Sequence, residues 1–69
     1  MNCYVKLKSN DDVLIENLKS IKQHPAAYVP ETEISDFDCF RLYDTQYTFI
    51  GDKSLLISGS DILFVTFES

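Results

Sequence analysis

Hydrophobic positions in the second half of the chain fall into four short runs separated by three polar turns. The runs are residues 37–43, 47–50, 54–58 and 62–67. The turns are residues 44–46, 51–53 and 59–61. Short runs rich in aromatic and β-branched residues and bounded by Gly and Asp are typical of strands joined by hairpins. Gly reaches positive φ without steric cost, and Asp hydrogen-bonds its own backbone. The pattern predicts a four-stranded antiparallel meander.

Residues 2–8 alternate strictly between apolar and polar positions. One side carries Cys3, Val5 and Leu7, and the other carries Tyr4, Lys6 and Lys8. A period of two with one apolar side indicates a half-buried strand.

The following segment has the pattern of a helix. Ser9 or Asn10 can cap the first free amide groups, and acidic residues follow at the positive end of the helix dipole. Leu14, Leu18 and Ile21 then repeat at i, i+4 and i+7, which is the apolar stripe of an amphipathic helix. We predict a helix from about residue 11 to about residue 23, ended by Pro25. Residues 26–29 are expected to be an extended linker or an edge strand.

The predicted fold class is α+β in one small domain, residues 1–69: a strand, a single helix, and then the meander. The helix packs on one face of the sheet and leaves the other face toward water. Tyr43, Tyr47 and Phe49 are expected on that second face. Because a large exposed apolar patch usually marks an interface, we expect a homodimer or a protein partner to cover it.

Charge is distributed unevenly along the chain, which has a net charge of −5. Residues 1–24 carry four lysines and three acids, whereas residues 25–69 carry two cations and eight acids. Such asymmetry bears on the choice of partner. The candidate partner-binding acids are Glu31, Glu33, Asp36, Asp38 and Asp44.

Clustered carboxylates also suit Ca²⁺ or Mg²⁺. Four of these acids, from Glu31 to Asp38, fall within eight residues. However, the run lacks the glycine of a calcium loop, and an acidic rim equally protects a sheet edge from aggregation. We therefore expect no metal site and no cofactor.

Signatures of catalysis are missing from the sequence. His24 is the only histidine, and its place before Pro25 suits a cation at a helix end. Two glycines cannot build a phosphate-binding loop. Cys3 and Cys39 do not make a zinc site with one histidine; free core thiols are expected, with a disulfide as the alternative. We predict no enzyme.

The sequence has no run of about 18 apolar residues and no apolar segment typical of a signal peptide near its first residue. We therefore expect a cytoplasmic protein that does not bind membranes.

These observations predict a small acidic protein-binding module. By size and charge alone it is similar to accessory proteins of phages and mobile elements that inhibit a host nuclease or defence complex. Acids held at fixed positions can imitate the phosphates of a nucleic acid and occupy the basic groove of such a host protein. The first alternative is a homo-oligomeric structural or regulatory module. The second is weak nucleic-acid binding through Tyr4, Lys6 and Lys8, which the overall negative charge opposes.

Overall fold

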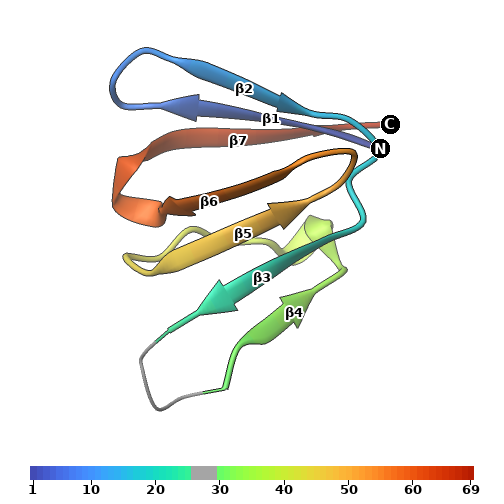
Figure 1. Ribbon diagram of the computed structural model, residues 1–69, viewed down its shortest axis with the longest axis vertical. Coiled ribbons are helices and arrows are strands. Elements are labelled where there is room, and N and C mark those ends of the chain that lie inside the picture. The colour runs from blue at the N-terminus through green and yellow to red at the C-terminus, as the bar shows by residue number, and fades with distance from the viewer. Residues whose placement is uncertain (26–29) are drawn as a thin grey trace.

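Short strands recur along the described chain, from Asn2 to Glu68. The computed structural model describes residues 1–25 and 30–69, and within them it contains seven strands, two 3-10 turns and no α-helix (Figure 1). The strands are β1 (Asn2–Leu7), β2 (Asp12–Ile15), β3 (Ser20–His24), β4 (Thr32–Ile34), β5 (Gln46–Ile50), β6 (Ser54–Ser58) and β7 (Ile62–Glu68). The 3-10 turns are η1 (Phe37–Cys39) and η2 (Gly59–Asp61). None of the described helical turns is long and apolar enough to span a membrane.

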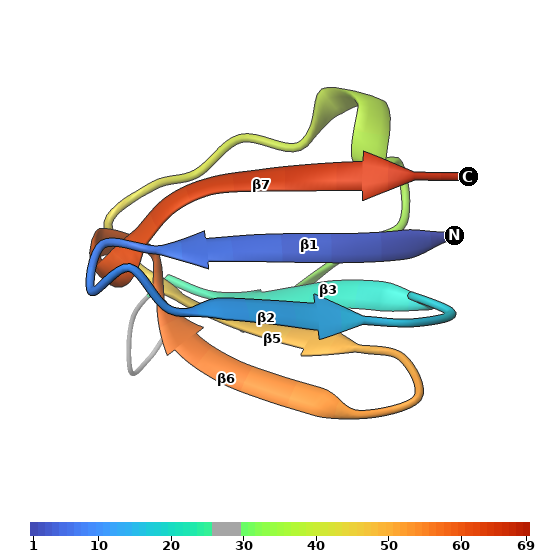
Figure 2. The same ribbon diagram turned by 90° about the horizontal axis from the view of Figure 1, so that it is seen from above.

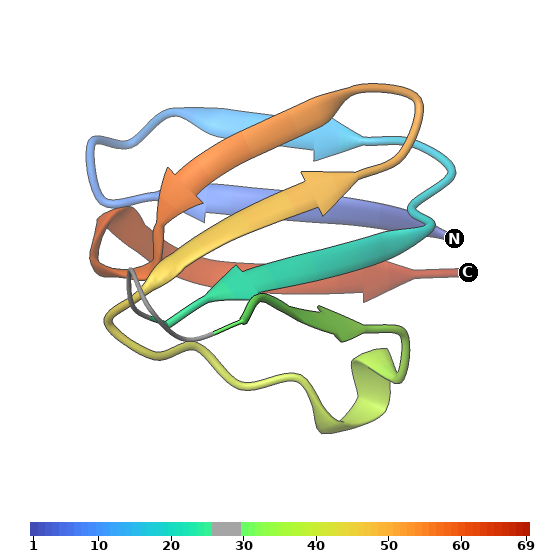
Figure 3. The ribbon, with the colours of Figure 1, turned by 60° about the horizontal axis from the view of Figure 1, so that its bottom comes forward.

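The strands form two antiparallel sheets. One has the order β2-β1-β7 and the other the order β4-β3-β5-β6. Figure 3 shows the four-stranded sheet in front of the three-stranded one, so the sheets are the two layers of a sandwich. The chain passes between the layers after β2 and again after β6.

The predicted helix at residues 11–23 is wrong, and with it the α+β fold class. Residues 12–15 form β2, which pairs with β1 so that Val13 lies opposite Val5 and Ile15 opposite Cys3. Asn17 has φ of 53°, a left-handed conformation that Asn tolerates better than most residues and that interrupts any helix. The chain then continues as β3.

The apolar spacing that suggested the helix is therefore divided between two strands and a bend. Leu14 is 43% exposed on the outer side of β2, whereas Leu18 and Ile21 are buried. Backbone hydrogen bonds hold the bend, from Leu18 N to the Met1 carbonyl and from Lys19 N to the Ile50 carbonyl, each 2.7 Å. The turn before β2 contains Asn10 at φ of 77°, so the predicted helix cap is a hairpin turn.

The meander is partly confirmed. β5 and β6 form the expected hairpin, with Thr48 opposite Leu56. The run at 37–43 is not a strand, because it contains η1 and irregular chain. The chain turns through η2 into the other layer, where β7 pairs with β1 and not with β6.

The pairing of β7 with β1 contains an irregularity beside Leu63. The register shifts between Lys6 and Leu7, whose partners are Phe64 and Ile62, so Leu63 is the extra residue of a bulge. Leu63 is 57% exposed, while Ile62 is buried.

The core lies between the two sheets. Its buried residues are Cys3, Val5, Ile15, Leu18, Ile21, Tyr47, Phe49 and Ile62. The expectation that Tyr47 and Phe49 face water is wrong, since both are 0% exposed. Where a helix was expected to cover one sheet face, a second sheet covers it.

Cys3 is a buried free thiol, as predicted. Burial raises its pKa to about 11, because desolvation disfavours the thiolate. The side chain of Cys39 and the predicted linker at 26–29 lie outside the described residues.

Gly59, at the corner between the layers, is expected to tolerate no side chain. A methyl group there would overlap the Tyr43 carbonyl oxygen and lie 3.0 Å from Tyr47 Cε2. We predict that Gly59→Ala lowers the free energy of unfolding by about 2 kcal/mol, measured by urea denaturation. Ser54→Ala, an exposed position in β6, is the control and should change it by less than about 0.5 kcal/mol. Equal stability of the two variants would contradict the tight corner.

Candidate protein-binding groove

Segment 35–45 closes one open side of the sandwich. Figure 2 shows it running beside β7, and Figure 3 shows it returning below β4 and β3. The Phe37 ring stacks on Phe67 of β7, with centroids 5.2 Å apart. The segment thus bridges an edge strand of the three-stranded sheet and the β4 edge of the other sheet.

Phe40 anchors the middle of this segment. Its ring meets Phe67 and Tyr47 edge-on at 5.6 Å and Phe49 at 6.3 Å. Edge-to-face contacts at these distances are favourable beyond the area they bury. Phe40 therefore packs against side chains from both sheets.

A groove of about 570 Å³ lies between this segment and the strands β3 and β4. Ile34 and Phe40 supply its apolar lining, together with the polar Gln23 and Ser35. Its charged and aromatic lining consists of Glu33, Asp36, Arg41 and Tyr43. This volume is within the range of sites that hold a small ligand or a few residues of a peptide.

Of the five predicted partner-binding acids, Glu33 and Asp36 line the groove. Glu33 belongs to β4 and lies opposite Lys22. The Asp36 side chain caps η1 by accepting a hydrogen bond of 3.2 Å from Asp38 N, which fixes its carboxylate at the end of the groove. Both residues line the groove because the chain passes from β4 into η1 along it.

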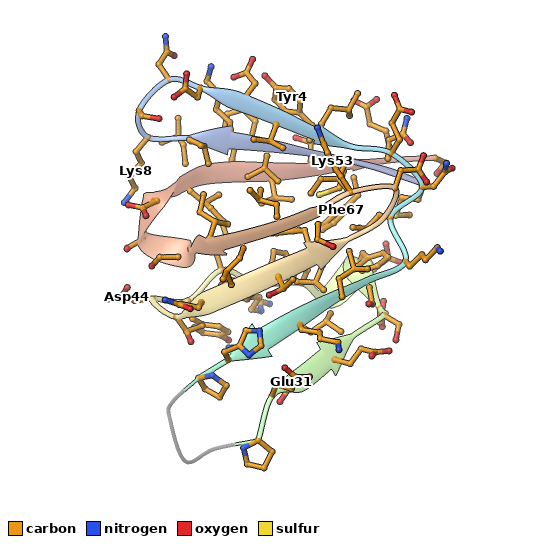
Figure 4. All side chains as sticks on the ribbon, in the orientation of Figure 1. Tyr4, Lys8, Glu31, Asp44, Lys53 and Phe67 are labelled. Carbon is orange, nitrogen blue, oxygen red and sulfur yellow. The ribbon has the colours of Figure 1, made fainter. Side chains whose placement is uncertain are left out.

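The other three acids lie elsewhere. Glu31 lies beside β4, and Asp44 lies in the turn before β5, well apart from it (Figure 4). Asp38 is exposed on η1. The five acids therefore do not form one continuous site.

Glu31 lies close to Lys22 and His24 on the outer side of the four-stranded sheet. Lys22 Nζ lies 3.3 Å from its Oε1, and His24 Nδ1 lies 3.2 Å from its Oε2. The other ring nitrogen of His24 is 3.1 Å from Thr48 Oγ1. His24 is thus a residue of β3 that links two neighbouring strands, and its prediction as a helix-end cation is wrong.

The order hydroxyl, imidazole, carboxylate is that of a nucleophilic triad. Catalysis by such a triad also requires donors aimed at a developing oxyanion and a place for the substrate. The groove described above is lined by other residues. Thr48, His24 and Glu31 connect β5, β3 and the residue before β4 on the outer side of the sheet.

The three predicted aromatic interface residues divide between surface and core. Tyr43 is 58% exposed beside the groove. Tyr47 is buried, and its hydroxyl accepts a 2.8 Å hydrogen bond from Tyr43 N and donates one of 3.3 Å to the Arg41 carbonyl. Tyr47 thereby positions two groove residues without touching a ligand.

Arg41 is the charged groove residue that the sequence pattern did not indicate; Gln23, Ile34, Ser35 and Phe40 were not predicted for the groove either. Arg41 lies within a run predicted to be a strand, where its side chain had no assigned neighbours. Arg41 is one of two cations in residues 25–69. Its isolation among the acids of this segment was the signal that could have identified it.

The face proposed for nucleic acid is poor in uncompensated positive charge. Lys6 Nζ lies 2.7 Å from Asp12 Oδ1. Hydrogen bonding lowers the pKa of the Asp12 carboxyl, and the carboxylate raises the pKa of Lys6 and Tyr4. Lys8 lies at the hairpin end of the sheet, away from Tyr4 (Figure 4).

A metal site or a related protein would each indicate a function. Within residues 1–25 and 30–69, no group of three or more His, Cys, Asp or Glu side chains is arranged to hold a metal ion. Comparison of the chain with protein-family models, with curated proteins and with solved structures gives no match.

Removing the Tyr47 hydroxyl should loosen the groove. Tyr47→Phe leaves the Tyr43 amide and the Arg41 carbonyl without their partner, and we expect a loss of about 1–3 kcal/mol in the free energy of unfolding. Hydrogen exchange at the Tyr43 amide should accelerate. Tyr43→Phe removes an exposed hydroxyl and is the matched control, with little expected change. Unchanged exchange in Tyr47→Phe would show that the hydroxyl does not hold the segment.

Proposed function

We propose that this chain is a protein-binding module that receives a basic segment of a partner in the groove beside β4 and acts by occupancy, with no chemical step. The observation that carries the proposal is the placement of Glu33 and Asp36 in a groove of about 570 Å³ that also has Ile34, Phe40 and Tyr43 in its lining. Apolar walls with a few placed charges are typical of ligand sites.

Charge favours a basic occupant. Glu33 and Asp36 outnumber Arg41 among the groove residues, and residues 25–69 carry eight acids and two cations. Complementary charge speeds encounter and excludes acidic partners. Salt screens such attraction, with a Debye length of about 10 Å at 0.1 M.

The partner class we propose is a host protein that acts on nucleic acid or serves in defence, which the module blocks as phage or mobile-element accessory proteins do. Proteins that bind phosphates present clustered Lys and Arg, and those side chains are what Glu33 and Asp36 would receive. The cytoplasm is the compartment in which such a partner would be met.

A charge-reversed groove should lose its basic ligand. We use fluorescein-labelled octalysine as the probe and measure its Kd by fluorescence anisotropy. Glu33→Lys with Asp36→Lys should weaken binding at least tenfold, because each change turns attraction into repulsion. Wild-type affinity should also fall as NaCl rises from about 50 to about 300 mM.

The matched control is Glu16→Lys with Glu68→Lys, which makes the same change in net charge at exposed positions away from the groove. It should change Kd by no more than threefold. If both double variants lose binding equally, the probe senses only net charge and the groove is not the site.

A second candidate is self-association through the outer face of the three-stranded sheet. Tyr4 and Phe64 lie there with ring centroids 6.3 Å apart, and Leu14 and Phe64 are 43% and 45% exposed. Copies with a net charge of −5 repel one another. On this face Lys6 and Asp12 compensate each other within one copy, so this pair adds no net charge to the interface.

For this candidate, light scattering should give a mass near twice 7.9 kDa for the wild type. Phe64→Lys should give a monomer, because a desolvated charge would be placed in the interface. Leu56→Lys is the control, since Leu56 is 64% exposed on the other sheet. A monomeric wild type at about 100 μM would exclude this candidate.

A further inference from the structure

We propose that the groove binds its partner by strand addition: an extended segment with alternating basic and apolar residues pairs with the outer edge of β4. The segment becomes the fifth strand of the four-stranded sheet. This inference rests on the proposed function and adds the mode of binding and the sequence pattern of the partner.

The first step is the place of β4 in its sheet. In the described chain β4 is an edge strand, paired with β3 on one side through three residue pairs, Gln23 with Thr32, Lys22 with Glu33 and Ile21 with Ile34. The backbone hydrogen bonds that join loops and strands elsewhere in the described residues do not involve residues 32–34. Alternate residues of such an edge turn their N–H and C=O groups outward, which is a template for another strand.

The second step is that the groove borders this edge. Glu33, Ile34 and Ser35 line it from β4 and its end, and Phe40 lines it from the bridging segment. β4 therefore combines an outer edge with the acidic groove. A second pocket of about 350 Å³, with Glu16, Asp52 and Lys53 in its lining, borders the edge strand β2. A strand laid along β4 would gain both backbone hydrogen bonds and side-chain contacts.

The third step is the alternation of β4 itself. Ile34 faces the core side, where it pairs with buried Ile21. Glu33 points to the opposite side, where its cross-strand neighbour is Lys22. An added strand continues the same two faces, so its core-side residues would meet Ile34 and Phe40 and favour apolar side chains.

The outward residues of the added strand would lie beside Glu33. Opposite charges on neighbouring strands are favourable, and like charges are unfavourable. Asp36 lies beyond the end of β4, where it adds a second acid to the groove lining. The pattern that fits is thus Lys or Arg alternating with Val, Ile or Leu.

The experiment uses a labelled nonapeptide of alternating Lys and Val, beginning and ending with Lys, at a concentration where light scattering shows it monomeric. Two analogues carry N-methyl groups on all Val amides or on all Lys amides. In a paired strand only one of these alternate sets of N–H groups points to the partner strand. One analogue should therefore lose at least tenfold in Kd, and the other should stay within threefold of the parent.

Strand addition should also be visible on the protein. On binding the parent peptide, amide exchange should slow at the outward-pointing members of residues 32–35 and stay unchanged in β2, an edge strand of the other sheet. Arg41→Gln should raise affinity for the Lys–Val peptide about threefold, because it removes the cation beside the ligand.

The outcomes separate the mode of binding from the proposed function. If both methylated analogues bind like the parent, or both lose affinity equally, the groove binds basic peptides without pairing to β4, and strand addition is wrong while the proposed function stands. If the Lys–Val parent fails to bind, or a Glu–Val peptide of the same length binds as well, the proposed function fails too.

Discussion

The packing of Phe40 against both sheets is the contact on which the rest of the structure depends. A three-stranded layer facing a four-stranded layer leaves one side of the core without a covering strand. Phe40 fills that side through its contacts with Tyr47, Phe49 and Phe67. In a chain of 69 residues, which buries only about 60% of its unfolded surface, one such aromatic cluster is a large part of the core.

The same contact creates the groove. Segment 35–45 is irregular, yet it is held by aromatic packing at Phe37 and Phe40 and by the Tyr47 hydroxyl beneath residues 41 and 43. Irregular chain held on a rigid scaffold is where binding residues are commonly found. Stability and the shape of the site are therefore coupled through Tyr47, which belongs to the core and positions the groove.

Charge is organised differently on the two outer faces. On the three-stranded sheet, Lys6 and Asp12 compensate each other at 2.7 Å. On the four-stranded sheet, Lys22 and His24 both pair with Glu31. Glu33 and Asp36 take part in none of these ion pairs, so their negative charge is not compensated within the chain by a salt bridge among the described residues. Exposed ion pairs such as these add little to stability, and their main effect is on where a charged partner is attracted.

Local pattern was sufficient for several elements. The alternation of residues 2–8 predicted β1, the turn at 51–53 predicted the β5–β6 hairpin, and the burial of Cys3 followed from its place in that alternation. Each of these depends on neighbours in the sequence, since a period of two or a turn residue acts within a few positions. The acidic character of residues 25–69 was likewise evident from the sequence.

Only the tertiary structure decided the rest. The spacing of Leu14, Leu18 and Ile21 fits a helix, and pairing of β2 with β1 made it two strands and a bend, because long-range pairing overrides local preference. The partner of β7 is 55 or more positions away along the chain, from Leu7 opposite Ile62 outward, and no local pattern identifies it. Once β7 joined β1, a second sheet covered Tyr47 and Phe49, and the exposed aromatic face expected from the sequence became the core.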